Sequence, residues 1–231
     1  MSSVSSQVDE ILRKLEKRGS KANRDGMARY GIVADKVFGV SVETIRSMAK
    51  EVGKDHDLAL ALWDTGWYEA RMMTPFIDEP SRVTSSQMDA WARDFDNWAI
   101  CDGLCFHLFD KTGHKWKKIQ QWSSRKDEFV KRAAFALLAG VALHDKKETD
   151  APFMKSLSLI ERAADDERNF VKKGVSWALR SVAHRNKSLH AASLDLATRL
   201  AESDDKTERW IGKDVIKDIT RPSILQKVAK K

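Results

Sequence analysis

One aspartate stands alone in a strongly apolar stretch of this sequence. Residues 98–109 read Trp-Ala-Ile-Cys-Asp-Gly-Leu-Cys-Phe-His-Leu-Phe, and Asp102 is the only acid among them. A helix over this range would be apolar on nearly every side, which is typical of a helix buried between others. A carboxylate there must be paired or hydrogen-bonded to offset its desolvation. Asp102 is therefore either a functional carboxylate or half of a structural ion pair, and the residues alone favour the ion pair.

Helical spacing places an indole ring beside this carboxylate. Trp98 lies one helical turn before Asp102, and Cys105 and Phe109 fall on the same face of the predicted helix. Indole faces attract cationic groups and exclude water, which strengthens the field of a nearby carboxylate. This pair is suited to stabilising positive charge that develops during a reaction.

A second predicted helix, over residues 126–143, supplies a cationic partner. Beyond Arg132 it carries no charge and is mostly apolar up to Leu143, so Arg132 stands at the edge of a buried stripe. Its guanidinium is able to pair with Asp102 or to hold a phosphate, and both alternatives stay open.

A third predicted helix, over residues 169–184, has two contrasting faces at about 100° per residue. Four small apolar residues share one side: Val171, Val175, Ala178 and Val182. Four others fall opposite them: Lys173, Trp177, Arg180 and His184. Basic residues interleaved with an exposed aromatic suit a phosphate-rich partner. Coverage of Trp177 by a neighbouring helix is an equally good interpretation.

Charge is distributed unevenly along the chain. The net charge of the whole is +7, with local values of +6 over residues 111–132 and over residues 168–187, and −5 over residues 64–102. This pattern predicts one basic and one acidic surface, and the basic surface suits an acidic polymer such as nucleic acid.

Other site chemistries lack their motifs. The six histidines are scattered, and Cys101, Cys105 and His107 do not have a usual zinc spacing, so no metal site is predicted. No Walker-type loop, GxGxxG or G-x-S-x-G occurs, so no nucleotide cofactor or serine nucleophile is expected. Several tryptophans, among them Trp63 and Trp116, are expected to fill the core.

The elements that position these residues are all expected to be helices. Strand-like alternation is almost absent and there are four prolines in 231 residues. Start and stop residues recur every ten to twenty positions: Ser41 before 42–52, Thr84 with Gln87 as a capping box, Asp96 and Asn97 before 98–109, and Ser188 before 189–202. About a dozen short helices in pairs predict an all-α stack of degenerate helical hairpins, with an irregular bundle as the alternative.

No interdomain linker is visible, so residues 1–231 are expected to form a single domain, with the first few residues disordered. The Ser-rich start has no apolar signal core and no stretch approaches a membrane span. With two cysteines spaced for one helix face, a reducing cytosol, that of a bacterium, is the expected compartment.

With these motifs the sequence resembles the DNA alkylation repair glycosylases built from HEAT-like repeats, the AlkD-type family. Residues 97, 98 and 102 match its Trp-x-x-x-Asp motif, residues 131–134 its Arg-Ala helix start, and residues 173–180 its Gly-x-x-Trp-x-Leu-Arg signature. Residues 38–50, with Leu62, Trp63 and residues 69–71, are similar to its early helices.

The resemblance implies a right-handed superhelix of paired helices with a basic groove for duplex DNA. It implies a monomeric, cofactor-free hydrolase of base excision repair, which excises cationic N3- and N7-alkylpurines. The implied catalytic residues are Asp102, Trp98, Trp177 and Arg132, and the expected DNA contacts are Lys131, Lys172, Lys173, Arg180 and His184.

Two other functions compete with this one. A module of the same fold could bind duplex or branched DNA without catalysis, and a helical-repeat scaffold could bind acidic protein partners. The complete set of Trp98, Asp102, Arg132 and Trp177 favours the glycosylase.

Overall fold

The computed structural model describes residues 3–230, which form fourteen α-helices and two short 3-10 helices, with no strand among them. The all-helical prediction is confirmed. The chain divides into two compact units, Met1–Thr112 and Gly113–Lys231. Whether these two units form the single domain expected from the sequence is not tested by this division, so that expectation stays a prediction. The expected disorder at the start falls in part on Met1 and Ser2, outside the described residues, while the first helix already begins at Val4.

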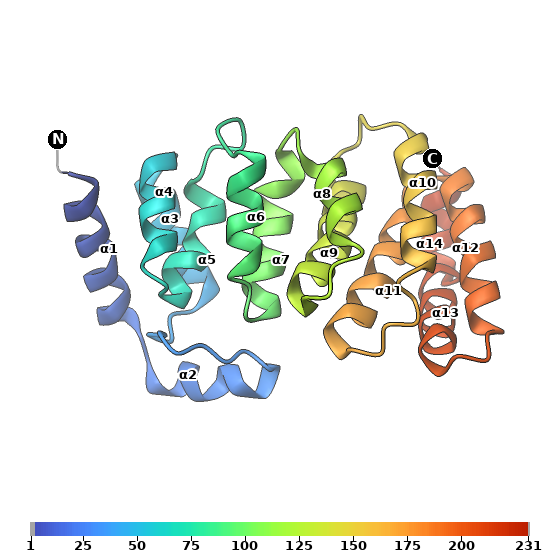
Figure 1. The fold of residues 1–231 in the computed structure, drawn as a ribbon, viewed down its shortest axis with the longest axis horizontal. Coiled ribbons are helices and arrows are strands. Elements are labelled where there is room, and N and C mark those ends of the chain that lie inside the picture. Colours follow the sequence, from blue (N-terminus) through green and yellow to red (C-terminus); the bar gives the residue numbers. More distant parts are fainter. Residues whose placement is uncertain (1–2, 231) are drawn as a thin grey trace. The chain divides into compact units, whose positions relative to one another are not determined.

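The first unit contains seven α-helices and two 3-10 helices (Figure 1). They are α1 (Val4–Arg18), α2 (Lys21–Met27), η1 (Ala28–Tyr30), α3 (Val42–Val52), α4 (His56–Asp64), α5 (Tyr68–Ile77), α6 (Ser85–Arg93), α7 (Trp98–His107) and η2 (Phe109–Lys111). Helix α5 packs against α3, α4 and α7, and α1 packs against α4 and α5. Trp63 stacks on Trp91 with ring centroids 4.4 Å apart, so Trp63 fills the core as predicted.

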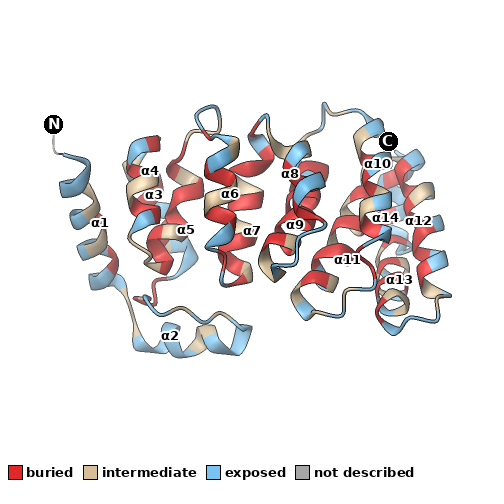
Figure 2. Ribbon diagram, in the orientation of Figure 1, coloured by how far each residue is buried: buried red, intermediate tan, exposed pale blue. Residues whose placement is uncertain are grey.

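The second unit contains seven α-helices. They are α8 (Lys115–Trp122), α9 (Glu128–His144), α10 (Asp150–Glu161), α11 (Asn169–Ala183), α12 (Lys187–Ala201), α13 (Lys206–Ile219) and α14 (Pro222–Ala229). Helices α9, α11 and α13 pack side by side as one row, and α8, α10 and α12 form a second row against them. Each residue of α9 from Ala133 to Ala142 is buried, so this helix forms the centre of the unit (Figure 2).

Capping side chains explain where the helices begin. Ser41 accepts a hydrogen bond from the Thr44 N–H at 3.2 Å, and α3 starts at Val42 as predicted. Thr84 caps α6 through the Gln87 N–H at 3.1 Å, but the Gln87 side chain donates to Asp78, so only half of the capping box forms. The predicted start at Leu189 was wrong. Asn186, rather than Ser188, caps the helix, which begins two residues earlier.

A buried carboxylate organises the turn between η1 and α3. Glu69 has no exposed surface and accepts hydrogen bonds from the N–H groups of Phe38, Gly39 and Val40, the shortest at 2.6 Å. Three successive backbone N–H groups around one anion form a nest. Burial also raises the pKa of the neighbouring Tyr68 hydroxyl to about 12, so the phenol stays neutral.

The same turn holds α2 in place. Gly39 has φ of +84°, and a Cβ added there would lie 2.3 Å from the Ser20 carbonyl oxygen, so only glycine fits. The Gly39 carbonyl accepts hydrogen bonds from the Ser20 N–H and from the Asn23 amide. Helix α2 therefore depends on Glu69 through this turn, and it runs crosswise to α3 through α7 (Figure 1).

Among residues 3–230, no helix combines the length and the apolar character that crossing a membrane requires.

We predict that Glu69→Gln lowers the free energy of unfolding by roughly 2–4 kcal/mol, because an amide presents N–H groups to a nest of donors and leaves buried groups unsatisfied. Urea denaturation followed by circular dichroism measures this. Glu51→Gln, a change at an exposed position of α3, is the matched control. Equal unfolding midpoints for the two variants would show that the nest contributes nothing.

Candidate functional site

A buried asparagine fixes the start of α7 and thereby the positions of Trp98 and Asp102. The Asn97 side-chain oxygen accepts hydrogen bonds from the N–H groups of Ala99 at 3.0 Å and Ile100 at 3.1 Å. This cap makes Trp98 the first residue of the helix and puts Asp102 one turn later.

Helix α7 was expected to be buried between others, but one of its sides is partly exposed. Trp98, Asp102 and Phe106 are half-buried, whereas Cys105 and Phe109 are completely buried. The prediction that Phe109 shares a helix face with Asp102 was wrong, because α7 ends at His107 and Phe109 lies in η2, while Cys105 lies on the buried side of α7. Trp98 and Asp102 lie at one border of the open side, and the core begins just beyond them. The pairing of indole and carboxylate on one side of the helix is confirmed.

The indole of Trp98 is anchored to the N-terminal segment. Its Nε1 donates a hydrogen bond of 2.8 Å to the carbonyl oxygen of Tyr30, and Tyr30 is 72 % exposed. Sequence reasoning missed this neighbour, because no local pattern links residues 68 positions apart. The backbone of an exposed tyrosine thus holds the indole at the start of α7.

Arg132 is built into the contact between α9 and α11. Its side chain is buried, and its Nη1 donates a hydrogen bond of 2.7 Å to the carbonyl oxygen of Phe170. The guanidinium carbon also lies 6.0 Å from the centroid of the Phe170 ring. Arg132 therefore has a fixed position at the first turn of α11.

The two predicted faces of α11 are confirmed. Val171, Val175, Ala178 and Val182 have no exposed surface. On the opposite face Lys173 is exposed, while Trp177 and Arg180 are half-buried, so Trp177 is not a core residue. Gly174 faces α9, where a Cβ would lie 3.5 Å from the Cγ of Arg132.

Acids from α13 reduce the charge of this basic face. The Arg180 Nε lies 3.8 Å from the Asp214 carboxylate, and His184 lies 3.0 Å from Asp218. Burial lowers the pKa of His184, so its ring is largely neutral at pH 7. The local net charge of +6 over residues 168–187 therefore overstates the positive charge of this face, because that count leaves out the acids of α13, which are distant in sequence.

The two predicted contacts Lys131 and Lys172 also have partners within the second unit. Lys131 lies 2.8 Å from Asp166, which Arg168 contacts through two nitrogens. The hydrogen bonds from Arg168, followed by those from Lys131, hold the pKa of Asp166 well below its usual range. The Lys172 ammonium lies 5.4 Å from the ring centroid of Trp210. Lys173 has no ion-pair partner among residues 3–230 and is the best placed of these cations to contact a phosphate.

The structure thus gives two groups of candidate residues. Trp98, Asp102 and the newly found Tyr30 lie together in the first unit. Arg132, Lys173 and Trp177 lie on adjoining helices of the second unit. Within the described part of the chain, no three histidine, cysteine, aspartate or glutamate side chains are grouped so as to hold a metal ion.

A model of the family described as DNA alkylation repair enzyme matches residues 11–218. A solved protein described as belonging to a new family related to the HEAT-like repeat DNA glycosylases, with affinity for branched DNA structures, superposes with a TM-score of 0.73. It is 18 % identical, over 91 % of this chain and 94 % of its own.

A designed armadillo repeat protein, solved with the peptide (KR)4, superposes with a TM-score of 0.41 at 11 % identity, over 94 % of this chain and 86 % of its own. No curated protein matches the sequence.

The likeness to the first of these structures makes the fold an α-solenoid of HEAT-like repeats. The family model extends over most of the sequence, including all the motifs around Asp102, Arg132 and Trp177. This chain belongs to the DNA alkylation repair enzyme family.

Proposed function

We propose that this protein is a monofunctional DNA glycosylase that hydrolyses the N-glycosidic bond of cationic N3- and N7-alkylpurines in duplex DNA. The observation that carries the proposal is the pair on α7: a half-exposed carboxylate, Asp102, one turn from an indole that is itself held by a hydrogen bond. Membership of the repair family supports it.

The proposed reaction requires little more from the protein than a carboxylate in a fixed position. Alkylation at N3 or N7 makes the purine cationic, so the base leaves as a neutral molecule and needs no separate acid. Cleavage builds positive charge on the sugar, as in other oxocarbenium-like reactions. Asp102, preorganised on the helix, is complementary to that charge, and it is also suited to orient the attacking water.

The aromatic residues have a complementary role in this proposal. Trp98 cannot rotate freely, because its Nε1 is bound to the Tyr30 carbonyl oxygen. Trp177 and Trp98 would pack against the sugar-phosphate backbone of the lesion and exclude water from the reacting bond. Tyr30, with most of its side chain exposed, would extend this apolar surface.

Arg132 and Lys173 would hold the DNA backbone. Arg132 is fixed by the Phe170 carbonyl oxygen, which suits a guanidinium that must meet a phosphate or a carboxylate in one geometry. Lys173 is exposed and suits a looser contact with phosphate. We place the activity in the cytosol of a bacterium.

The alternative is a non-catalytic module that binds branched DNA. The description of the solved relative with a TM-score of 0.73 favours it. Release of the base from duplex DNA that contains a single 7-methylguanine distinguishes the two, because a pure binding module leaves the glycosidic bond intact.

We predict that Asp102→Asn slows single-turnover excision of 7-methylguanine by about 10²-fold or more, while duplex affinity changes little, because one preorganised charge is lost. Cleavage of abasic sites on a gel measures the rate. Asp64→Asn, at an exposed position of the same unit, is the control and should excise normally. Wild-type excision by the Asp102 variant would refute the assigned role.

We predict that charge reversal at Lys173 weakens binding to undamaged duplex for every sequence tested and reduces the salt slope by about one phosphate contact. Arg180→Glu should have a smaller effect than Lys173→Glu, because Asp214 already neutralises part of the Arg180 charge. Fluorescence anisotropy against salt concentration measures both. A larger effect at Arg180 would mean that α11 contacts DNA mainly through its C-terminal half.

We predict that Trp177→Ala reduces excision more than it reduces affinity, since its contact is made at the lesion. Trp210→Ala, at an exposed tryptophan of α13, is the control and should leave excision nearly unchanged. Equal losses in excision and affinity for Trp177→Ala would assign this residue to general DNA binding.

A further inference from the structure

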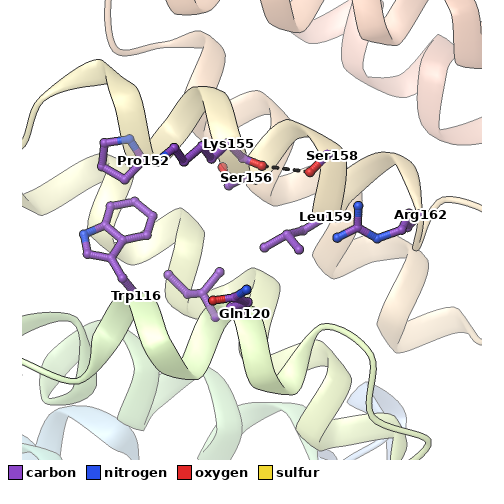
Figure 3. Close-up of a pocket in the computed structure, with 9 residues that line it drawn as sticks. Trp116, Gln120, Pro152, Lys155, Ser156, Ser158, Leu159 and Arg162 are labelled. Carbon is purple, nitrogen blue, oxygen red and sulfur yellow. Dashed lines mark hydrogen bonds between the residues drawn. The ribbon is translucent and has the colours of Figure 1, made fainter.

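The second unit has a cavity of about 310 Å³ between α8 and α10 (Figure 3). It is lined by Trp116, Ile119, Gln120, Pro152, Lys155, Ser156, Ser158, Leu159 and Arg162. These residues belong to the row of α8, α10 and α12, whereas Arg132, Lys173 and Trp177 belong to the row of α9 and α11. The cavity is therefore separate from the residues that the proposed function uses in this unit.

Its apolar end is preorganised by a tryptophan. Trp116, expected to fill the core, is half-exposed and forms a wall with Pro152 (Figure 3). The Trp116 Nε1 donates a hydrogen bond of 2.8 Å to Glu148, and its ring meets Phe153 edge-on at 5.0 Å. Because these two contacts already fix the ring, a ligand that packs on its remaining surface loses little side-chain entropy of Trp116 on binding.

The rim of the cavity is cationic. Lys155 and Arg162 are both exposed, no ion pair involves either of them within residues 3–230, and the lining contains no acid. Nearby acids already have partners, since Glu148 accepts from Trp116 and Glu161 lies 3.0 Å from Arg199. The cavity thus combines an apolar pocket with positive charge that the protein itself does not neutralise.

The spacing of the cations indicates an extended ligand. Lys155 and Arg162 are two helical turns apart on α10, which corresponds to roughly 10 Å along the helix axis. About three residues of an extended peptide cover that distance. In Figure 3, Arg162 lies at the end opposite Trp116, with Leu159 between them. A ligand that satisfies both ends needs an apolar group at one point and carboxylates along its length.

We propose that this cavity is a docking site for a short acidic peptide segment of a partner protein, with one large apolar side chain inserted between Trp116, Pro152 and Leu159. Lys155 and Arg162 bind its carboxylates, and the Gln120 amide is placed at the rim to bond its backbone. A stacked nucleotide fits the lining less well, because Pro152 and Leu159 rather than a second aromatic ring face the indole.

Docking on this row leaves the α9 and α11 row accessible. The partner would be held by the second unit without displacing a ligand from Lys173 or Trp177. The proposal does not depend on excision, and it can be tested with undamaged samples of the full chain.

The probe is a short fluorescein-labelled polyaspartate peptide with a single central phenylalanine, and its binding is followed by fluorescence anisotropy. We expect saturable binding that weakens about tenfold or more in Lys155→Glu and in Arg162→Glu. Lys117→Glu, the same charge change at an exposed position of α8 outside the lining, is the control and should bind as the wild type does. Circular dichroism establishes that each variant is folded.

Two further ligands complete the test. The same peptide with alanine in place of phenylalanine should bind at least several-fold more weakly, because the apolar pocket stays empty. Labelled oligothymidine should lose no more affinity for Arg162→Glu than it loses for the control Lys117→Glu. The proposal would be overturned if neither peptide bound, if both peptides bound equally well, or if Lys117→Glu weakened peptide binding as much as the other two variants do. Selective loss of oligothymidine binding in Arg162→Glu would also overturn it.

Discussion

The arrangement of the first unit depends on one buried anion. Glu69 gathers three successive backbone N–H groups between residues 38 and 40, and the turn that results receives α2 through the carbonyl oxygen of Gly39. From α2 the chain continues into η1, which ends at Tyr30, and the Tyr30 carbonyl oxygen holds the indole of Trp98. The position of one side chain in the candidate site is thus tied, through backbone hydrogen bonds, to a carboxylate on another helix.

The second unit uses a different device. Several of its basic side chains are paired with acids: Lys131 and Arg168 share Asp166, Arg180 faces Asp214, and the largely neutral ring of His184 faces Asp218. These pairs link α9 to the N-terminal end of α11, and they link α11 to α13. Within residues 3–230, Lys173 has no ion-pair partner, and neither do Lys155 and Arg162 on the other row. Cations that the protein itself does not neutralise are available to an acidic ligand.

What the sequence could predict follows from the range of each interaction. The buried stripe of α11 and the start of α3 were predicted correctly, because helical periodicity and capping act over a few residues. The pairing of Trp98 with Asp102 was predictable for the same reason.

Apart from the start of α12, where two neighbouring residues could both act as the cap, the failures involve packing or distant partners. The partly exposed side of α7 could not be predicted, because packing decides which side faces the core and an almost wholly apolar helix has no periodicity to reveal that side. Tyr30 and the acids of α13 could not be found, since their contacts join residues far apart in the chain. Trp116 was mistaken for a core residue because composition does not show where a helix row leaves a cavity.

The burial of α9 has a consequence for motion. From Ala133 to Ala142 this helix is enclosed by α8 and α11, so its amide hydrogens can exchange with solvent only when the whole unit opens. Arg132 immediately precedes that protected segment and is bonded to the first turn of α11. The guanidinium is consequently next to a segment that we expect to exchange slowly, whereas the side chain of Lys173 is exposed to solvent. In the proposed function, the fixed guanidinium of Arg132 would set the register at one phosphate, and the exposed side chain of Lys173 would tolerate distortion of the DNA backbone at the next.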